Sequence, residues 1–313
     1  MFAYCRGSGT GLYVCYHLWP TLTARSARSV YEMTQTKIEW TDFTWNPWWG
    51  CSEIAPECGV HGGGTGFCYA AVFAGRGLHA VHAGVAVAGK WTGKITRSSP
   101  SVWSQPLKWH AGRVFTCSMA DFWHEAVPLA WLDEALDVIE RTPHLTYQVL
   151  TKRPGNIQRK LDALKRRLPE NIWLGATIGH PKSLPLLKPL LRVDAPNLRF
   201  LSCEPLLADL TDLSLDGIGW VIGGGQSGHG AAICDPDWMR RLRDKCTAEN
   251  IPFFMKQWGT WESNPTPRDE ELDPSAKGGA TLDGRLWREF PVCTLSLFSD
   301  HGQFTKPPRA KIA

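Results

Sequence analysis

The chain has 313 residues, 43% of them hydrophobic, and its 34 basic and 30 acidic residues give a net charge of +4. This composition excludes wholesale disorder, and so small a charge permits a nucleic-acid partner without calling for one. The sequence contains no run of roughly 18 apolar residues, the length of a membrane span, so we expect no membrane contact. Ten cysteines clustered unevenly in a chain this long favour metal binding over a disulfide scaffold, and a reduced, cytoplasmic protein is expected.

The chain is expected to have three parts. Residues 1–32 show little periodicity, and regular patterning begins after Met33. We therefore expect a leader over 1–32 that is disordered or not native. A (β/α) barrel is expected over 33–260, with a cysteine loop at 51–68, followed by a C-terminal extension over 261–313.

From residue 113 onward, short apolar runs alternate with amphipathic stretches. The expected strands are 113–118, 146–151, 171–178, 197–203, 219–223 and 251–256. The expected helices are 128–141, 154 to about 168, 181–192 and 236–250. This alternation predicts a parallel sheet with crossover helices.

The polar residues distinguish a barrel from a doubly wound sheet. Nearly every apolar run ends in a polar or small cluster, such as Thr151-Lys152-Arg153 or Ser202-Cys203-Glu204. A doubly wound sheet would concentrate such groups at one switch point, whereas a barrel collects them from every strand on one face. We therefore predict an α/β fold, a partial (β/α) barrel of about six to seven parallel strands.

Cys51, Cys58 and Cys68 lie in a polar, glycine-rich segment. Structural cysteines favour apolar runs instead, so three unrelated thiols are the less favoured interpretation. Zinc would take the three thiolates with His61, whereas a 4Fe–4S cluster would take the thiolates alone and keep one iron open. The spacing does not separate these two metals.

Nine ordered motifs between residues 36 and 291 carry a resemblance to a known family. They are TKIEWTDFTWNPWWGC (36–51), FTCSMADFWHE (115–125), QVLTKRP (148–154), WLG (173–175), RFLSCEP (199–205), WVIGGGQSG (220–228), DPDW (235–238), FFMKQWG (253–259) and LDGRLW (282–287). The chain resembles the three-Cys-motif phage protein family, whose core is similar to that of radical S-adenosylmethionine enzymes. It departs from the family in having nine residues, not two, between Cys58 and Cys68, and Gln226 in place of a usual Glu.

The resemblance implies a 4Fe–4S cluster on Cys51, Cys58 and Cys68 whose open iron binds S-adenosylmethionine for reductive cleavage. The substrate would be a small molecule or a nucleotide, for instance a nucleobase in phage DNA or RNA metabolism, and an unidentified protein partner is a further expectation. In the radical enzymes an aromatic residue before the last cysteine packs near the adenine, and Phe67 holds that place. One rival is a zinc-stabilised nucleic-acid-binding or adaptor protein without catalysis. Another is a metal-dependent nuclease.

Candidate catalytic residues are Asp121, His124 and Glu204, which follow expected strands. Asp121 could hold an amino group or cap a helix, and His124 could act as acid or base. Glu204 could face the barrel mouth or pair with Arg153. The residues expected to contact the cofactor are Phe67, Ser118, Asp121, Lys152, Thr177, Glu204, Gly224, Gln226 and Lys256.

Other motifs have more ordinary interpretations. The glycine run before Gln226 resembles a phosphate or adenine cradle only weakly, and Cys117 and Cys203 are expected in the core. The tryptophans of 44–49 and 256–261 could stack on bases, but more often such residues cover the rim or bottom of a barrel.

Overall fold

The computed structural model describes residues 36–59, 68–76, 82–195, 197–228, 230–266 and 277–292. The expected leader over 1–32 and most of the expected C-terminal extension lie outside these ranges.

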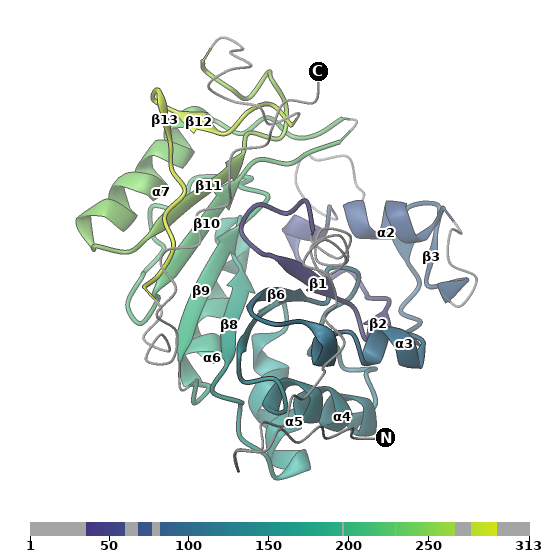
Figure 1. Cartoon of the computed structure of the whole chain (residues 1–313). Helices are drawn as coiled ribbons and strands as arrows, with labels where there is room; N and C mark the ends of the chain where they lie inside the picture. The colour runs from purple at the N-terminus through teal and green to yellow at the C-terminus, as the bar shows by residue number, and fades with distance from the viewer. Residues whose placement is uncertain are drawn as a thin grey trace, which may run out of the picture.

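Seven parallel strands form one sheet that curls into a half-barrel, and this confirms the predicted fold class (Figure 1). In spatial order they are β1 (Phe43–Trp45), β6 (Gly112–Thr116), β7 (Leu145–Thr151), β8 (Ile172–Thr177), β9 (Leu198–Cys203), β10 (Trp220–Gly224) and β11 (Phe253–Gln257). Spatial order follows chain order from β6 to β11, as successive β-α units predict. The carboxyl ends of all seven strands therefore lie at one end of the half-barrel, here called the mouth.

Helices cover the outer face of the sheet. They are α4 (Leu129–Glu140), α5 (Ile157–Leu164), α6 (Leu187–Arg192) and α7 (Pro236–Ala248). In α4 the apolar residues Leu132, Ala135, Leu136 and Ile139 recur at helical spacing and are buried in the main core. Among the helices of the described ranges, none is long and apolar enough to cross a membrane.

Aromatic side chains fill the concave face away from the mouth. This second cluster contains Trp40, Phe115, Trp173, Phe200, Trp220, Ile222 and Phe254. Side chains alternate along a strand, so Trp173 packs among these rings while Thr177, four residues on, lies on the same face at the mouth. Gly175 lies between them, where a Cβ would be 2.4 Å from the Phe200 ring. The half-barrel thus has an aromatic floor beneath a polar rim.

Most expected elements are found to within one or two residues at each end, and larger differences occur at three places. β1 was not foreseen, because its three residues lie in a tryptophan-rich motif without strand-like alternation. The helix expected over 154–168 begins as the 3₁₀ turn η4 (Pro154–Asn156) and ends at Leu164, after which Lys165 adopts a φ of 54°. The region 181–192 splits into η5 (Pro181–Leu186) and α6, because Pro185 has no N–H to continue a helix.

Cys51, Cys58 and Cys68 lie on a long insertion between β1 and β6. It contains β2 (Trp48–Trp49), η1 (Pro56–Cys58), α2 (Tyr69–Ala74), β3 (Ala86–Val87), β4 (Lys90–Trp91), β5 (Thr96–Arg97), α3 (Pro100–Trp103) and η3 (Pro106–Lys108). β2 pairs with β5, and β3 with β4. After β11 the chain adds the hairpin β12 (Thr281–Leu282) and β13 (Arg285–Leu286). Among the tryptophans of 44–49, Trp45 and Trp48 are fully buried in the main core, where they cannot stack on bases.

Candidate functional site

A cavity of about 170 Å³ lies at the mouth and gathers most of the predicted site residues. Its lining includes Cys51, Cys58, Cys68, Ser118, Asp121, Lys152, Thr177, Glu204, Gln226 and Lys256. The structure thus brings polar groups from several strand ends together on one face. Gly224 lies just behind the wall, where a Cβ would be 3.3 Å from Glu204 Cγ. Phe67 and His61 lie outside the described residues.

Cys51 is held beside the end of β6. Gly50, directly before it, forms a bridge with Ala120, and its amide donates to the Met119 carbonyl at 3.1 Å. Gly50 has a φ of +112°, and a Cβ there would be 2.0 Å from the Lys94 carbonyl oxygen. Only glycine suits this close passage, which sets the position of the first thiol.

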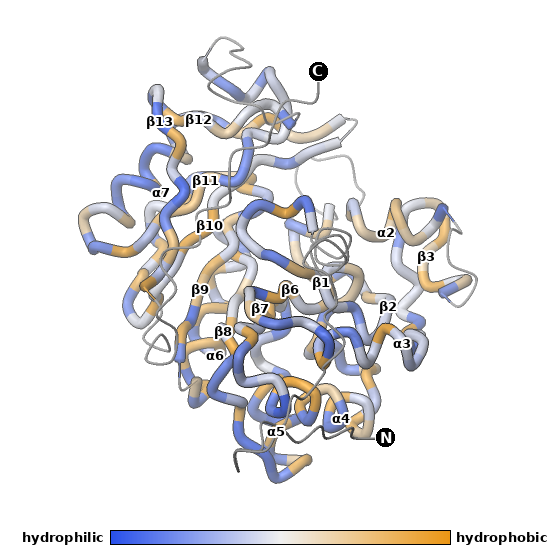
Figure 2. The backbone as a smooth tube through the Cα atoms, in the orientation of Figure 1, coloured by the Kyte–Doolittle hydropathy of each residue, from blue (hydrophilic) through white to orange (hydrophobic). Residues whose placement is uncertain are grey.

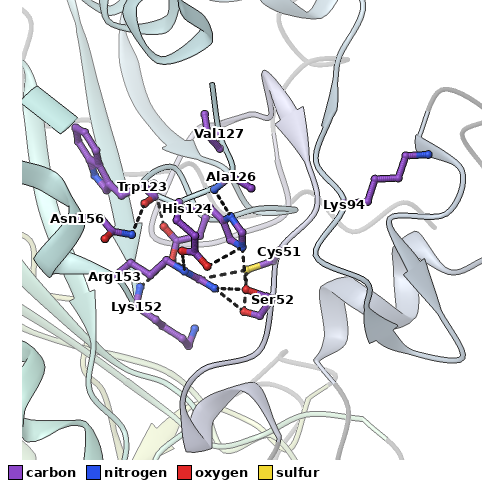
Figure 3. Close-up of polar contacts among 12 residues, drawn as sticks. Cys51, Ser52, Lys94, Trp123, His124, Ala126, Val127, Lys152, Arg153 and Asn156 are labelled. Atoms are coloured by element: carbon purple, nitrogen blue, oxygen red, sulfur yellow. Dashed lines mark hydrogen bonds and ion pairs between the residues drawn. The ribbon is translucent and has the colours of Figure 1, made fainter. Parts of the chain in front are cut away.

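Arg153 connects this cysteine to the barrel (Figure 3). Its Nη1 donates to Cys51 Sγ at 3.5 Å and to Asp121 Oδ2 at 3.2 Å. Its Nη2 donates to the carbonyl and hydroxyl oxygens of Ser52 at 2.8 and 2.7 Å, and its Nε to Glu125 at 2.9 Å. The side chain is 4% exposed. The planar guanidinium of Arg153 can donate to all of these groups at once and so acts as a hub of the site. A lysine ammonium could not reproduce this arrangement.

The carboxylate of Asp121 is fully engaged. Oδ1 accepts from the Trp123 amide and the Thr151 hydroxyl, at 3.0 and 2.7 Å. Oδ2 accepts from the Lys152 amide and from Arg153, at 3.1 and 3.2 Å. Asp121 is not the cap of α4, since that position is Pro128. Four hydrogen bonds leave it no lone pair for an amino group, so we assign it a positioning role.

His124 lies behind the cavity wall, 2% exposed. Its Nδ1 accepts from the Ala126 amide at 3.1 Å, which leaves Nε2 to donate to Ser52 Oγ at 2.9 Å in the neutral ring. Burial and the nearby Arg153 lower the pKa of His124 below 6.5, and Glu125 opposes them. A neutral imidazole with both nitrogens engaged supports the Cys51–Ser52 segment more readily than it transfers protons.

Glu57 fixes the second cysteine and was missed by sequence analysis. It is 7% exposed within η1, and its carboxylate accepts from the Gly179 amide at 2.7 Å and the Ser183 hydroxyl at 2.8 Å. The turn that ends in Cys58 is thereby anchored to the loop after β8. No local signal in the sequence marks a glutamate as a partner for residues more than 120 positions away.

Lys152 lies among the three thiols. Burial alone would lower the pKa of its ammonium, but electrostatic interaction with Cys58, Cys68 and Glu57 favours the charged form and raises the pKa above 10.5. Its ammonium has no hydrogen-bond or ion-pair partner within the described ranges. The third thiol, Cys68, directly precedes α2. A lysine in this place would offset negative charge on the thiolates.

Burial favours the protonated form of the Cys51 thiol in the free chain. Burial and the charge of Asp121 raise the pKa of Cys51 to about 12, although Arg153 lowers it. Burial also raises the pKa of Cys117 and Cys203, which are 3% and 0% exposed and form part of the core, as predicted. Metal binding at Cys51 would therefore release a proton.

The opposite wall of the cavity comes from β8, β9 and β11. Thr177 is 1% exposed, and its Oγ1 has no hydrogen-bond partner in the described structure. Lys256 Nζ lies 2.6 and 2.7 Å from the two carboxylate oxygens of Glu204. The alternative in which Glu204 pairs with Arg153 is wrong, because Arg153 binds Ser52 of the cysteine loop and Glu204 pairs with Lys256. An orphaned buried hydroxyl aimed into a cavity points to a missing ligand.

The glycines before Gln226 serve packing. A Cβ on Gly225 would be 1.9 Å from the Trp258 carbonyl oxygen, and one on Gly223 would be 2.8 Å from Met239 Sδ. These close contacts explain why both positions are glycine, so a phosphate-binding role is not needed to explain them. Gln226 lines the cavity while its Oε1 accepts from the Ala232 amide at 2.9 Å. The Ser118 hydroxyl is likewise held in place, because it accepts a hydrogen bond from Asn46 Nδ2 at 3.0 Å.

The donor set fits a thiolate-bound metal centre in its chemistry. Three thiols from separate short segments share one cavity with a lysine, and the thiolate is the ligand form for iron–sulfur clusters and for zinc. Within the described ranges, no group of three or more His, Cys, Asp or Glu side chains is arranged so that it could hold a metal ion. The segment between Cys58 and Cys68 is only partly inside those ranges.

Fold and site together define a half-barrel α/β protein with three thiols at the carboxyl ends of its strands. The chain belongs to the family described as "Protein of unknown function (DUF5131)", which it matches over residues 35–291. That span contains the whole sheet and all three thiols. No curated protein and no solved structure matches the chain significantly.

Proposed function

We propose that Cys51, Cys58 and Cys68 hold a 4Fe–4S cluster with which the chain cleaves S-adenosylmethionine. The observation that carries this is the meeting of three thiols and Lys152 in one cavity at the mouth. The half-barrel and the resemblance to radical S-adenosylmethionine enzymes support the same chemistry. When bound, the cluster supplies the single electron that such a cleavage requires.

The chain's own residues have separate tasks in this proposal. Arg153 positions Cys51, and Glu57 fixes the turn that carries Cys58. Lys152 offsets the negative charge of the thiolates. On the opposite wall, Thr177 Oγ1 is available to the cofactor, and Lys256 could exchange Glu204 for the cofactor's carboxylate. The substrate, a small molecule or a nucleotide, would enter the same cavity from the mouth.

The rival functions have less support. A nuclease would need Asp121 and His124 free to bind metal or move protons, yet both are engaged in hydrogen bonds that organise the cysteine loop. A zinc-stabilised adaptor would use the same thiols as the cluster, so metal analysis separates the two.

Metal analysis of anaerobically purified protein tests the proposal. We expect brown protein with iron and sulfide in near-equal amounts. Cys51→Ala, Cys58→Ala and Cys68→Ala should each lose the colour and the iron. Cys246→Ala, a change in α7, is the matched control and should retain both. Colourless protein that carries one zinc after anaerobic reconstitution would overturn the proposal.

A further inference from the structure

The short helix α2 presents an apolar stripe that remains partly exposed, although the Phe73 ring lies 6.3 Å from that of Trp49 and the Tyr69 hydroxyl donates to the Ser118 carbonyl at 3.3 Å. Tyr69, Val72 and Phe73 are 64%, 36% and 40% exposed. They lie at positions i, i+3 and i+4 of the helix, and Arg76 follows just after its end at Ala74. Ala71, on the other face, is fully buried. The exposed stripe is therefore a distinct surface of the insertion, and Figure 2 shows α2 largely in the hydrophobic colours.

This stripe forms one wall of a groove of about 1240 Å³. The facing wall comes from the loops after β10 and β11, with Ser227, Gly228 and Gly259. A Cβ at Gly228 would have no atom within 4 Å. Because glycine has no side chain there, a flat group could approach the backbone of this wall. The groove shares Tyr69, Ser118 and Ser227 with the thiol cavity, so the two are continuous.

The charge of the groove selects an anionic occupant. Its described lining includes Arg76 and Lys277 and contains no aspartate or glutamate. The Arg76 guanidinium has no hydrogen-bond or ion-pair partner in the part of the chain that the structure describes. The groove is about seven times as large as the thiol cavity, so it suits an extended ligand. Exposed aromatic rings beside a cation are the elements of single-strand recognition, in which bases stack and phosphates meet basic side chains.

We propose that this groove binds a single-stranded nucleic acid, with bases stacked on Tyr69 and Phe73 and a phosphate on Arg76. One nucleotide of the bound strand would then enter the adjoining cavity that contains Cys51, Cys58 and Cys68. That the strand is the substrate of the thiol centre rests on the proposed function, whereas its binding in the groove does not.

Fluorescence anisotropy with labelled eight-nucleotide single strands of DNA and RNA tests the inference on the anaerobically purified full chain. We expect binding that weakens with salt, because phosphate contacts release counterions. Tyr69→Ser and Phe73→Ser should each raise Kd about fivefold or more, the least expected for a lost stacking contact. Arg76→Ser should also raise Kd and flatten its salt dependence. Arg167→Ser, which removes an exposed charge before β8 at the opposite end of the barrel, should leave Kd unchanged.

Three results would overturn the inference: no binding of either strand, equal binding of a duplex or a mononucleotide, or equal weakening by Arg167→Ser. Circular dichroism of each variant shows whether it remains folded. Iron and sulfide content is measured on the same samples. Strand binding without iron would contradict the proposed function alone, and iron without strand binding would contradict this inference alone.

Discussion

Arg153 and Cys51 are 102 residues apart in the chain, yet Nη1 of the arginine lies 3.5 Å from the thiol sulfur. The same guanidinium binds Asp121 and Ser52, so one buried cation joins the cysteine loop to the ends of β6 and β7. This contact explains why the first thiol has a defined place before any metal binds.

Arg153→Met should destabilise the fold by about 3 to 5 kcal/mol, because it leaves the buried carboxylate of Asp121 without its ion-pair partner. Urea denaturation followed by circular dichroism measures the change. Arg167→Met, at an exposed arginine, should stay within about 0.5 kcal/mol of wild type. Similar stabilities for the two variants would show that the hub does not hold the loop.

Glu57→Ala should cost about 2 kcal/mol, since the buried amide of Gly179 loses a charged acceptor. Freed from its anchor, the η1 turn should also expose Cys58, which is 8% exposed in the intact fold. Alkylation rates of the Cys58 peptide, measured by mass spectrometry on metal-free protein, should rise. An unchanged rate would mean that the turn is held by other contacts.

His124 should make stability depend on pH. Its pKa is lowered in the folded chain, so the unfolded chain binds a proton more readily. The stability that this provides is full above the ordinary pKa of 6.5 and is lost as the pH falls below it. Between about pH 7 and pH 5, wild type should lose stability more steeply than His124→Gln, which can still donate to Ser52. Parallel curves would contradict a buried neutral histidine.

Much of the sheet could be predicted from the sequence, because the apolar runs of β6 to β11 have the length and endings of parallel strands. The residues that the sheet strands bring to the mouth followed from the same pattern, since they lie at or just beyond the carboxyl end of a strand. What could not be predicted depends on distant partners. The carboxylate of Glu57 and the guanidinium of Arg153 have no local signature, and the orphaned hydroxyl of Thr177 shows only when its neighbours are in place. β1 was missed because three residues carry no measurable period.

Thr177→Val separates a ligand-binding role from a structural one. Replacing an unpartnered buried hydroxyl with a methyl group should raise stability by about 1 kcal/mol. The same change should weaken binding of S-adenosylmethionine in isothermal titration calorimetry. Thr151→Val, which removes the 2.7 Å hydrogen bond to Asp121, should instead lower stability. Lower stability with unchanged binding in Thr177→Val would contradict a role in the cofactor site.

Reductive cleavage of S-adenosylmethionine is the reaction that we propose for the three thiols at the mouth of the half-barrel. Anaerobic protein with its full cluster content is reduced with dithionite and incubated with S-adenosylmethionine, and 5′-deoxyadenosine is quantified by mass spectrometry. We predict 5′-deoxyadenosine and methionine in equal amounts, formed slowly even without the true substrate, and none from Cys51→Ala. Wild-type protein that retains its cluster and binds S-adenosylmethionine but forms no 5′-deoxyadenosine would contradict the proposed cleavage reaction.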